Sequence, residues 1–156
     1  MKRSRSFISG RTIFLSALVL IIVVFVVEII VTNFALMGIR AGFSELPHNL
    51  ESIRTAELVY YEKYGEFRSV GECPLELPGR QRSSWEGECA DRFQALGWAP
   101  DRSVRCQYMV QVISRQNEVD DFKLTAQCDL DGDGIPSIFE ASRNSPYKRI
   151  TSVDIY

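Results

Sequence analysis

The chain has 156 residues, of which 46% are hydrophobic, and a formal net charge of −2. After Arg40 there are 19 acidic and 13 basic residues, so this region carries a charge of −6 (13 − 19). That balance argues against a nucleic-acid partner, because a phosphate-binding surface needs clustered cations. Much of the hydrophobic content lies in one early block, so we expect an N-terminal segment followed by one domain of about 110 residues.

Residues 1–10 form a short basic segment, and an apolar block follows it. The run at residues 13–31 is interrupted only by Ser16 and Glu28. Its length matches what a helix needs to cross the bilayer core, whereas a signal peptide would have a shorter core and a small-residue cleavage site after it. We therefore predict a transmembrane helix at residues 11–35.

Charge on the two sides of this helix predicts its orientation. The cations Lys2, Arg3, Arg5 and Arg11 precede the apolar run, and no acid accompanies them. By the positive-inside rule the N-terminus stays in the cytoplasm, so the inner membrane is the first expected partner. The remainder then faces the periplasm or the exterior. Glu28 has two interpretations: it reaches the headgroup region or is protonated, or it marks a functional site within the membrane.

Residues 36–65 are predicted to continue the helix as an amphipathic segment. Apolar residues recur at three- and four-residue steps in a stripe, formed by Leu46, Leu50, Ile53, Ala56 or Glu57, Tyr60 and Tyr64. Pro47 predicts a kink near residues 43–47, and Gly65 is expected to end the helix.

Residues 66–156 are predicted to form a β domain. Residues 66–88 read as irregular and 89–96 as one or two helical turns; alternation predicts strands at 104–114 and 122–128. Residues 136–142 are expected to return as a third strand and 150–156 to form an edge strand. The fold class is α+β: one long N-terminal helix whose second half packs on a three- or four-stranded antiparallel sheet. The expected core comprises Leu50, Ile53, Tyr60, Val110, Phe122 and Leu124, with Tyr61, Tyr64 and Trp98 also packing inward and Trp85 exposed.

All four cysteines lie in the β domain, which favours disulfides in an oxidising compartment. A zinc site is the alternative, but no C-x-x-C element is present. Folding the two predicted strands about Asn117 places Cys106 opposite Cys128, close enough to bridge. The pairs are therefore predicted to be Cys106–Cys128 and, by elimination, Cys73–Cys89.

The sharpest local motif is the run from Asp129 to Gly134. Asp129, Asp131 and Asp133, with Glu140, satisfy the spacing of an EF-hand loop for calcium. The flanks do not fit, because an EF-hand needs a helix on each side and residues 122–128 read as a strand. A tight Asp-Gly turn is one interpretation, and a calcium site carried on such a turn is the other.

No pattern in the chain supports catalysis. The single histidine, His48, lies beside Pro47 in the predicted helix and is expected to be a surface residue, so it suggests no Ser-His-Asp triad, and paired cysteines leave no Cys-His dyad. We expect the protein not to be an enzyme.

The order of these segments resembles type IV pilins and the pseudopilins of type II secretion. A basic leader ends at Gly10, and Thr32-Asn33-Phe34 falls where such pilins often have Pro-Asn-Phe. Further similar residues follow without a gap: Ser44-Glu45, Asn49-Leu50, Ile53, Thr55-Ala56-Glu57, Tyr60, Phe93, Leu96-Gly97-Trp98, Pro100, Val104, Tyr108 and the Asp129–Gly134 turn. The resemblance covers residues 10–142.

The resemblance implies a structural role. A prepilin peptidase would cleave after Gly10 and methylate the new N-terminal residue, Arg11, and other pilin or pseudopilin subunits would be partners. The family usually has a glutamate five residues after the cut, where this chain has Leu15, and an apolar residue where it has Arg11. Two hypotheses follow: a minor or tip subunit of a pilus or pseudopilus, or an uncleaved membrane-anchored binding module that does not polymerise and is stabilised by calcium.

Overall fold

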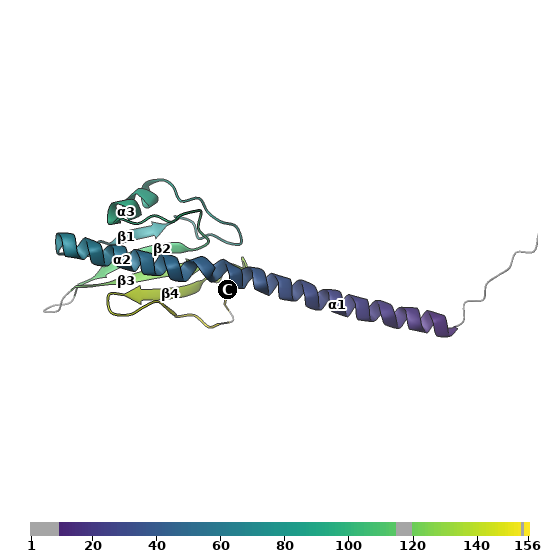
Figure 1. Ribbon diagram of the computed structural model, residues 1–156. Helices are drawn as coiled ribbons and strands as arrows, with labels where there is room; N and C mark the ends of the chain where they lie inside the picture. Colours follow the sequence, from purple (N-terminus) through teal and green to yellow (C-terminus); the bar gives the residue numbers. More distant parts are fainter. Residues whose placement is uncertain (1–9, 115–119, 154) are drawn as a thin grey trace, which may run out of the picture. The chain divides into compact units, whose positions relative to one another are not determined.

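The computed structural model describes residues 10–114, 120–153, 155 and 156 (Figure 1). The elements follow in the order α1, a 3-10 turn, α2, β1, α3 and then β2 to β5. By internal packing the chain divides into two units, Met1–Gly38 and Ile39–Tyr156.

The first unit consists of most of α1 (Gly10–Gly42). Large apolar side chains along the 13–31 run are exposed. Among the described helices, this N-terminal one is long and apolar enough to span a membrane. The hydroxyl of Thr32 and the amide of Asn33 donate to backbone carbonyls four residues earlier, both at 2.8 Å. These polar side chains are thus satisfied within the helix, as a lipid environment requires.

A short 3-10 turn lies at the place where the sequence predicts a kink. A 3-10 turn, Phe43–Glu45, separates α1 from α2 (Leu46–Tyr64). Pro47 lies in the first turn of α2, where its missing N–H costs no helical hydrogen bond. Gly65 ends α2 with a left-handed φ of 77°, and its N–H donates to the Tyr61 carbonyl at 2.8 Å.

The second unit contains a five-stranded antiparallel sheet in the order β1-β2-β3-β4-β5. The strands are β1 (Val70–Cys73), β2 (Gln107–Ile113), β3 (Asp121–Cys128), β4 (Ser137–Ser142) and β5 (Lys148–Arg149). β2 and β3 pair from Gln107 with Gln127 to Ile113 with Asp121, a register symmetrical about position 117. The predicted register is therefore confirmed, while the hinge at 116–118 lies outside the described residues.

The edges of the sheet differ from the prediction. β1 falls inside the stretch read as irregular, because Gly71 and Glu72 give it no apolar alternation. At the other edge, β5 precedes the predicted strand at 150–156. The N–H of Ile150 still donates to the Ile138 carbonyl at 2.8 Å, but the Ile138 N–H donates to the Thr151 hydroxyl at 3.1 Å instead of a backbone carbonyl. The ladder ends there.

The core lies between α2 and the sheet, and Figure 1 shows α2 lying over the sheet. Five of the six predicted core residues are buried: Leu50, Ile53, Val110, Phe122 and Leu124. Tyr60 is only half-buried, and Tyr64 is exposed. Both lie in the last turns of α2, where their ring centroids are 4.4 Å apart, and Tyr60 packs against the edge of the core.

The short helix α3 (Glu88–Leu96) adds an aromatic cluster to this core. Phe93 and Trp98 are buried, and their ring centroids are 5.5 Å apart. Trp85, expected to be exposed, is half-buried and lies 5.2 Å from Trp98 and 5.3 Å from Phe93. The apolar surface of these rings explains why an otherwise polar loop turns its tryptophan inward.

Candidate functional site

The Asp129–Gly134 segment forms a tight turn between β3 and β4. One oxygen of the Asp129 carboxylate accepts hydrogen bonds from the N–H groups of Gly132 and Asp133, at 2.8 and 3.2 Å. The other oxygen accepts one from Gly134 at 3.1 Å. Gly132 and Gly134 have φ values of 69° and 84°, which favour glycine. The two glycines thus let the backbone curl around one carboxylate.

This turn brings three predicted ligands together. Oxygen atoms of Asp129, Asp131 and Asp133 lie within 4.8 Å of one another. Asp129 is buried, Asp131 is half-buried and Asp133 is exposed. In the described part of the chain none of the three forms an ion pair, and Oδ1 of Asp131 is buried without a hydrogen-bond partner. Clustered carboxylate oxygens are the ligands that a hard cation such as calcium prefers.

Glu140, the fourth predicted ligand, does not join this cluster. It lies within β4 opposite Thr125, whereas Asp129 follows the end of β3. Its carboxylate instead faces Lys123, with an N–O distance of 3.7 Å. The predicted set of four ligands is therefore corrected to three. Glu140 lies within the extended strand β4, which places it away from the turn. Strands, not helices, flank the turn, so it is not an EF-hand.

Two other segments hold the turn in place. Nε of Arg80 donates to the Asp131 carbonyl at 2.5 Å. The N–H of Leu130 donates to the Tyr156 carbonyl at 3.1 Å. The Arg80 side chain also passes close to Gly132, where a Cβ would meet it at 3.2 Å, a tight contact that adds to the preference for glycine set by φ.

Two disulfides tie the second unit together. Cys73–Cys89 joins the end of β1 to the start of α3, and Cys106–Cys128 joins the segment before β2 to the end of β3. The Cα atoms are 5.3 and 4.4 Å apart, and both pairings are those expected from the sequence. Because Cys128 directly precedes Asp129, the second disulfide fixes the start of the turn.

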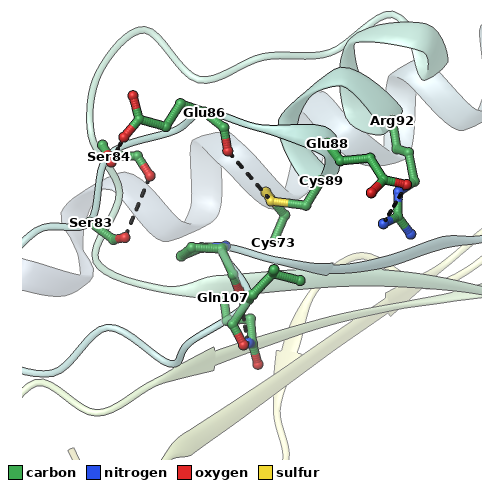
Figure 2. Close-up of a disulfide and its surroundings, with 10 residues drawn as sticks. Cys73, Ser83, Ser84, Glu86, Glu88, Cys89, Arg92 and Gln107 are labelled. Atoms are coloured by element: carbon green, nitrogen blue, oxygen red, sulfur yellow. Dashed lines mark hydrogen bonds and ion pairs between the residues drawn. A yellow bond between two sulfur atoms is a disulfide. The ribbon is translucent and has the colours of Figure 1, made fainter.

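Figure 2 shows how the first disulfide organises its surroundings. Cys89 is the second residue of α3 and lies beside the 83–86 loop, where the Ser84 hydroxyl donates to the Glu86 carboxylate at 2.7 Å. The Gln107 side-chain amide donates to the carbonyls of Pro74 and Leu75, at 2.8 and 3.2 Å. The residues after Cys73 are thus fastened to β2 on one side and to α3 on the other.

The expected processing site lies at the start of the described chain. Gly10 is the first residue of α1, and Arg11 follows with its side chain exposed. The basic leader before them lies outside the described residues. Leu15, at the position of the family's glutamate, is 50% exposed on α1.

Two buried polar groups lie on α2: Asn49, which was not predicted to be buried, and Glu57, which was predicted only as an alternative to Ala56 in the stripe. The Asn49 amide donates to the Tyr108 hydroxyl at 2.9 Å across the helix–sheet interface. Burial raises the pKa of Tyr108 well above its usual value. Glu57 is fully buried, and only the helical spacing that places it among the apolar residues of the stripe signals this.

No family model, curated protein or solved structure matches the chain.

Proposed function

We propose that this protein is a minor structural subunit of a type IV pilus or a type II secretion pseudopilus, anchored in the inner membrane by α1. The observation that carries the proposal is the order of elements. An apolar N-terminal helix is followed by α2, which packs on an antiparallel sheet cross-linked by two disulfides. This order is the one that the pilin resemblance implies.

Charge and cysteine chemistry support the orientation. The cations Lys2, Arg3 and Arg5 precede the apolar run, which favours a cytoplasmic N-terminus. Disulfides persist in oxidising compartments, so the second unit belongs in the periplasm or outside the cell. The described groups include no assembled nucleophile–base pair, and the proposed role is not catalytic.

Two residues favour a minor or tip position over a major subunit. Leu15 replaces the glutamate that would pair with a neighbour's N-terminal amine, and Arg11 replaces an apolar first residue. A subunit with nothing stacked above it has no need of that ion pair. The same two residues favour the second candidate, an uncleaved membrane-anchored module with the pilin-like fold and the Asp129–Asp133 turn as its cation site.

The two candidates are separated by the intact mass of the protein extracted from its native membrane. A mass matching a chain that starts at Arg11, with or without one methyl group, supports the filament subunit. Gly10→Val is the matched variant, because a branched side chain at the cleavage position should leave the leader attached. The full-length mass in the unaltered protein would contradict processing and favour the uncleaved module.

Assembly needs a separate measurement. Filaments sheared from the cell surface, or pseudopili formed on overproduction of the secretion system, should contain the processed chain at low stoichiometry. The Gly10→Val variant should be absent from them. A processed chain that never sediments with filaments would contradict the filament role even if cleavage occurs.

A further inference from the structure

Glu57 is a fully buried carboxyl group within α2. Its Oε2 accepts a hydrogen bond from the backbone N–H of Arg68 at 3.1 Å. Its Oε1 is buried and has no hydrogen-bond partner. One oxygen is therefore satisfied and the other is not, a condition that penalises the ionised form far more than the neutral one.

The bond to Arg68 ties the connection between α2 and β1 back onto the helix. This connection, residues 65–69, carries Phe67, which is buried. The Phe67 ring stacks on Tyr61 with centroids 4.5 Å apart and meets Phe122 edge-on at 5.0 Å. Opening the connection would give Glu57 water and would uncover this aromatic contact.

The charges around Glu57 do not neutralise it. Burial raises the pKa of Glu57 to about 7, and the N–H and the positive charge of Arg68 oppose this only in part. β2 has no charged residue, and its Tyr108 hydroxyl binds Asn49. Several other charged groups on the packed elements interact elsewhere: Arg54 with Glu51 and the carbonyls of Ser142 and Arg143, Arg143 with the rings of Tyr61 and Phe67, Lys123 with Glu140, Asp121 with the N–H groups of Phe122 and Arg143, Arg92 with Glu88, and Glu45 with Arg82. Asp91 on α3 and Glu62 and Lys63 on α2 are exposed to solvent.

We propose that Glu57 is a proton-operated latch: its neutral form holds residues 65–69 closed on α2, and its ionised form favours opening of that connection to solvent. The folded-state pKa lies above the ordinary value of 4.5. The stabilisation is therefore complete below pH 4.5 and is lost as the pH rises towards about 7. The latch is closed in mild acid and loosened above neutrality, whether or not the protein joins a filament.

The test is hydrogen exchange of the full-length protein in detergent micelles between pH 5 and pH 8, with rates corrected for intrinsic exchange. Protection of residues 65–69 should fall at least about tenfold over this range, the effect of one unit of pKa shift. Glu57→Gln mimics the neutral form and should keep its protection at pH 8. Glu62→Gln, at an exposed position on the same helix, should behave like the unaltered protein.

Protection that does not change with pH in the unaltered protein, or that falls equally in Glu57→Gln, would overturn the proposal. A direct titration covers the case in which Glu57→Gln fails to fold. The carboxyl carbon of Glu57 in the unaltered protein should titrate with a midpoint above about pH 6 in the NMR spectrum. A midpoint at or below that value would overturn the latch.

Discussion

Two buried carboxyl groups in the second unit, those of Asp129 and Glu57, have opposite surroundings. Asp129 is 7% exposed and accepts hydrogen bonds from three backbone N–H groups. Glu57 is 0% exposed, accepts one, and leaves Oε1 without a partner. What a buried carboxylate costs therefore depends here on the donors that reach it more than on its depth.

The backbone around each residue explains the difference. Asp129 opens a turn in which Gly132 and Gly134 adopt positive φ, so successive N–H groups point at one side chain. Glu57 lies inside a helix, where the local N–H groups are already bonded to carbonyls. Only a donor from another segment, such as Arg68, can reach it. A turn supplies donors for an anion, whereas the middle of a helix does not.

Removing the Asp129 carboxylate, which accepts three hydrogen bonds, should have the largest effect on stability. Asp129→Ala leaves three N–H groups of the turn without their acceptor and should lower the free energy of unfolding by about 3 kcal/mol. Denaturant unfolding of the full chain in detergent, with chelator present, measures this. Asp133→Ala is the control: Asp133 is exposed and accepts one bond, from Ile135, so its loss should cost about 1 kcal/mol or less. Equal losses in the two variants would mean that the donors around Asp129 do not matter.

Removing the Glu57 carboxyl, which accepts one hydrogen bond, should change stability in the opposite direction. Glu57→Gln should raise the free energy of unfolding at pH 8 by about 2 kcal/mol and leave it nearly unchanged at pH 4.5. The gain should appear between pH 4.5 and about 7, the interval between the ordinary and the raised pKa of Glu57. Unfolding curves of both proteins across this range give the difference directly. A variant less stable than the unaltered protein at pH 8 would contradict the comparison.

The buried hydrogen bond between Asn49 and Tyr108 tests the same dependence on hydrogen-bond partners with two groups that satisfy each other. Tyr108→Phe leaves the buried Asn49 amide without its acceptor, so it should cost about 1.5 kcal/mol. Tyr147→Phe is the matched control, because Tyr147 is 40% exposed, and it should change stability by less than about 0.5 kcal/mol. If the two substitutions have the same effect, the bond between α2 and β2 contributes nothing measurable.

The sequence predicted those parts of the fold that follow a simple periodicity. Alternation between residues 104 and 128 gave β2, β3 and their register, and the register gave the Cys106–Cys128 pair. β1 was missed because it is a short edge strand with Gly71 and Glu72 at its centre. Such a strand is held by its pairing with β2 rather than by its own residue preferences.

The candidate site was predicted less well, for a related reason. Spacing alone selected Glu140 as a fourth ligand, but the chain extends by about 3.3 Å per residue in a strand. Glu140 is the fourth residue of β4, so it is carried away from the turn. Conversely, nothing local marks Glu57 as half-satisfied, because the donor that reaches it comes from Arg68, in the connection beyond the end of the helix.

Calcium should stabilise the Asp129–Gly134 turn. In the described chain, three carboxylates have oxygens within 4.8 Å of one another and none forms an ion pair. If the site binds calcium with an affinity of roughly 0.1 mM, we expect 1 mM calcium to raise the melting temperature by about 5 °C. Differential scanning fluorimetry with calcium and with chelator measures the shift. Asp131→Asn should abolish it, because Asp131 contributes a buried oxygen without another partner. An unaltered melting temperature in calcium would remove the turn as a cation site.

Glu140→Gln should have the smallest effect and tests the geometry most directly. The half-exposed pair with Lys123 is worth about 0.5 kcal/mol or less, so stability should barely change. Lys123→Met breaks the same pair without altering the carboxylate and should behave alike. Both variants should keep the full calcium response if only Asp129, Asp131 and Asp133 hold the ion. Loss of the response in Glu140→Gln but not in Lys123→Met would show that Glu140 reaches the ion, and that β4 must leave its pairing with β3 for calcium to bind.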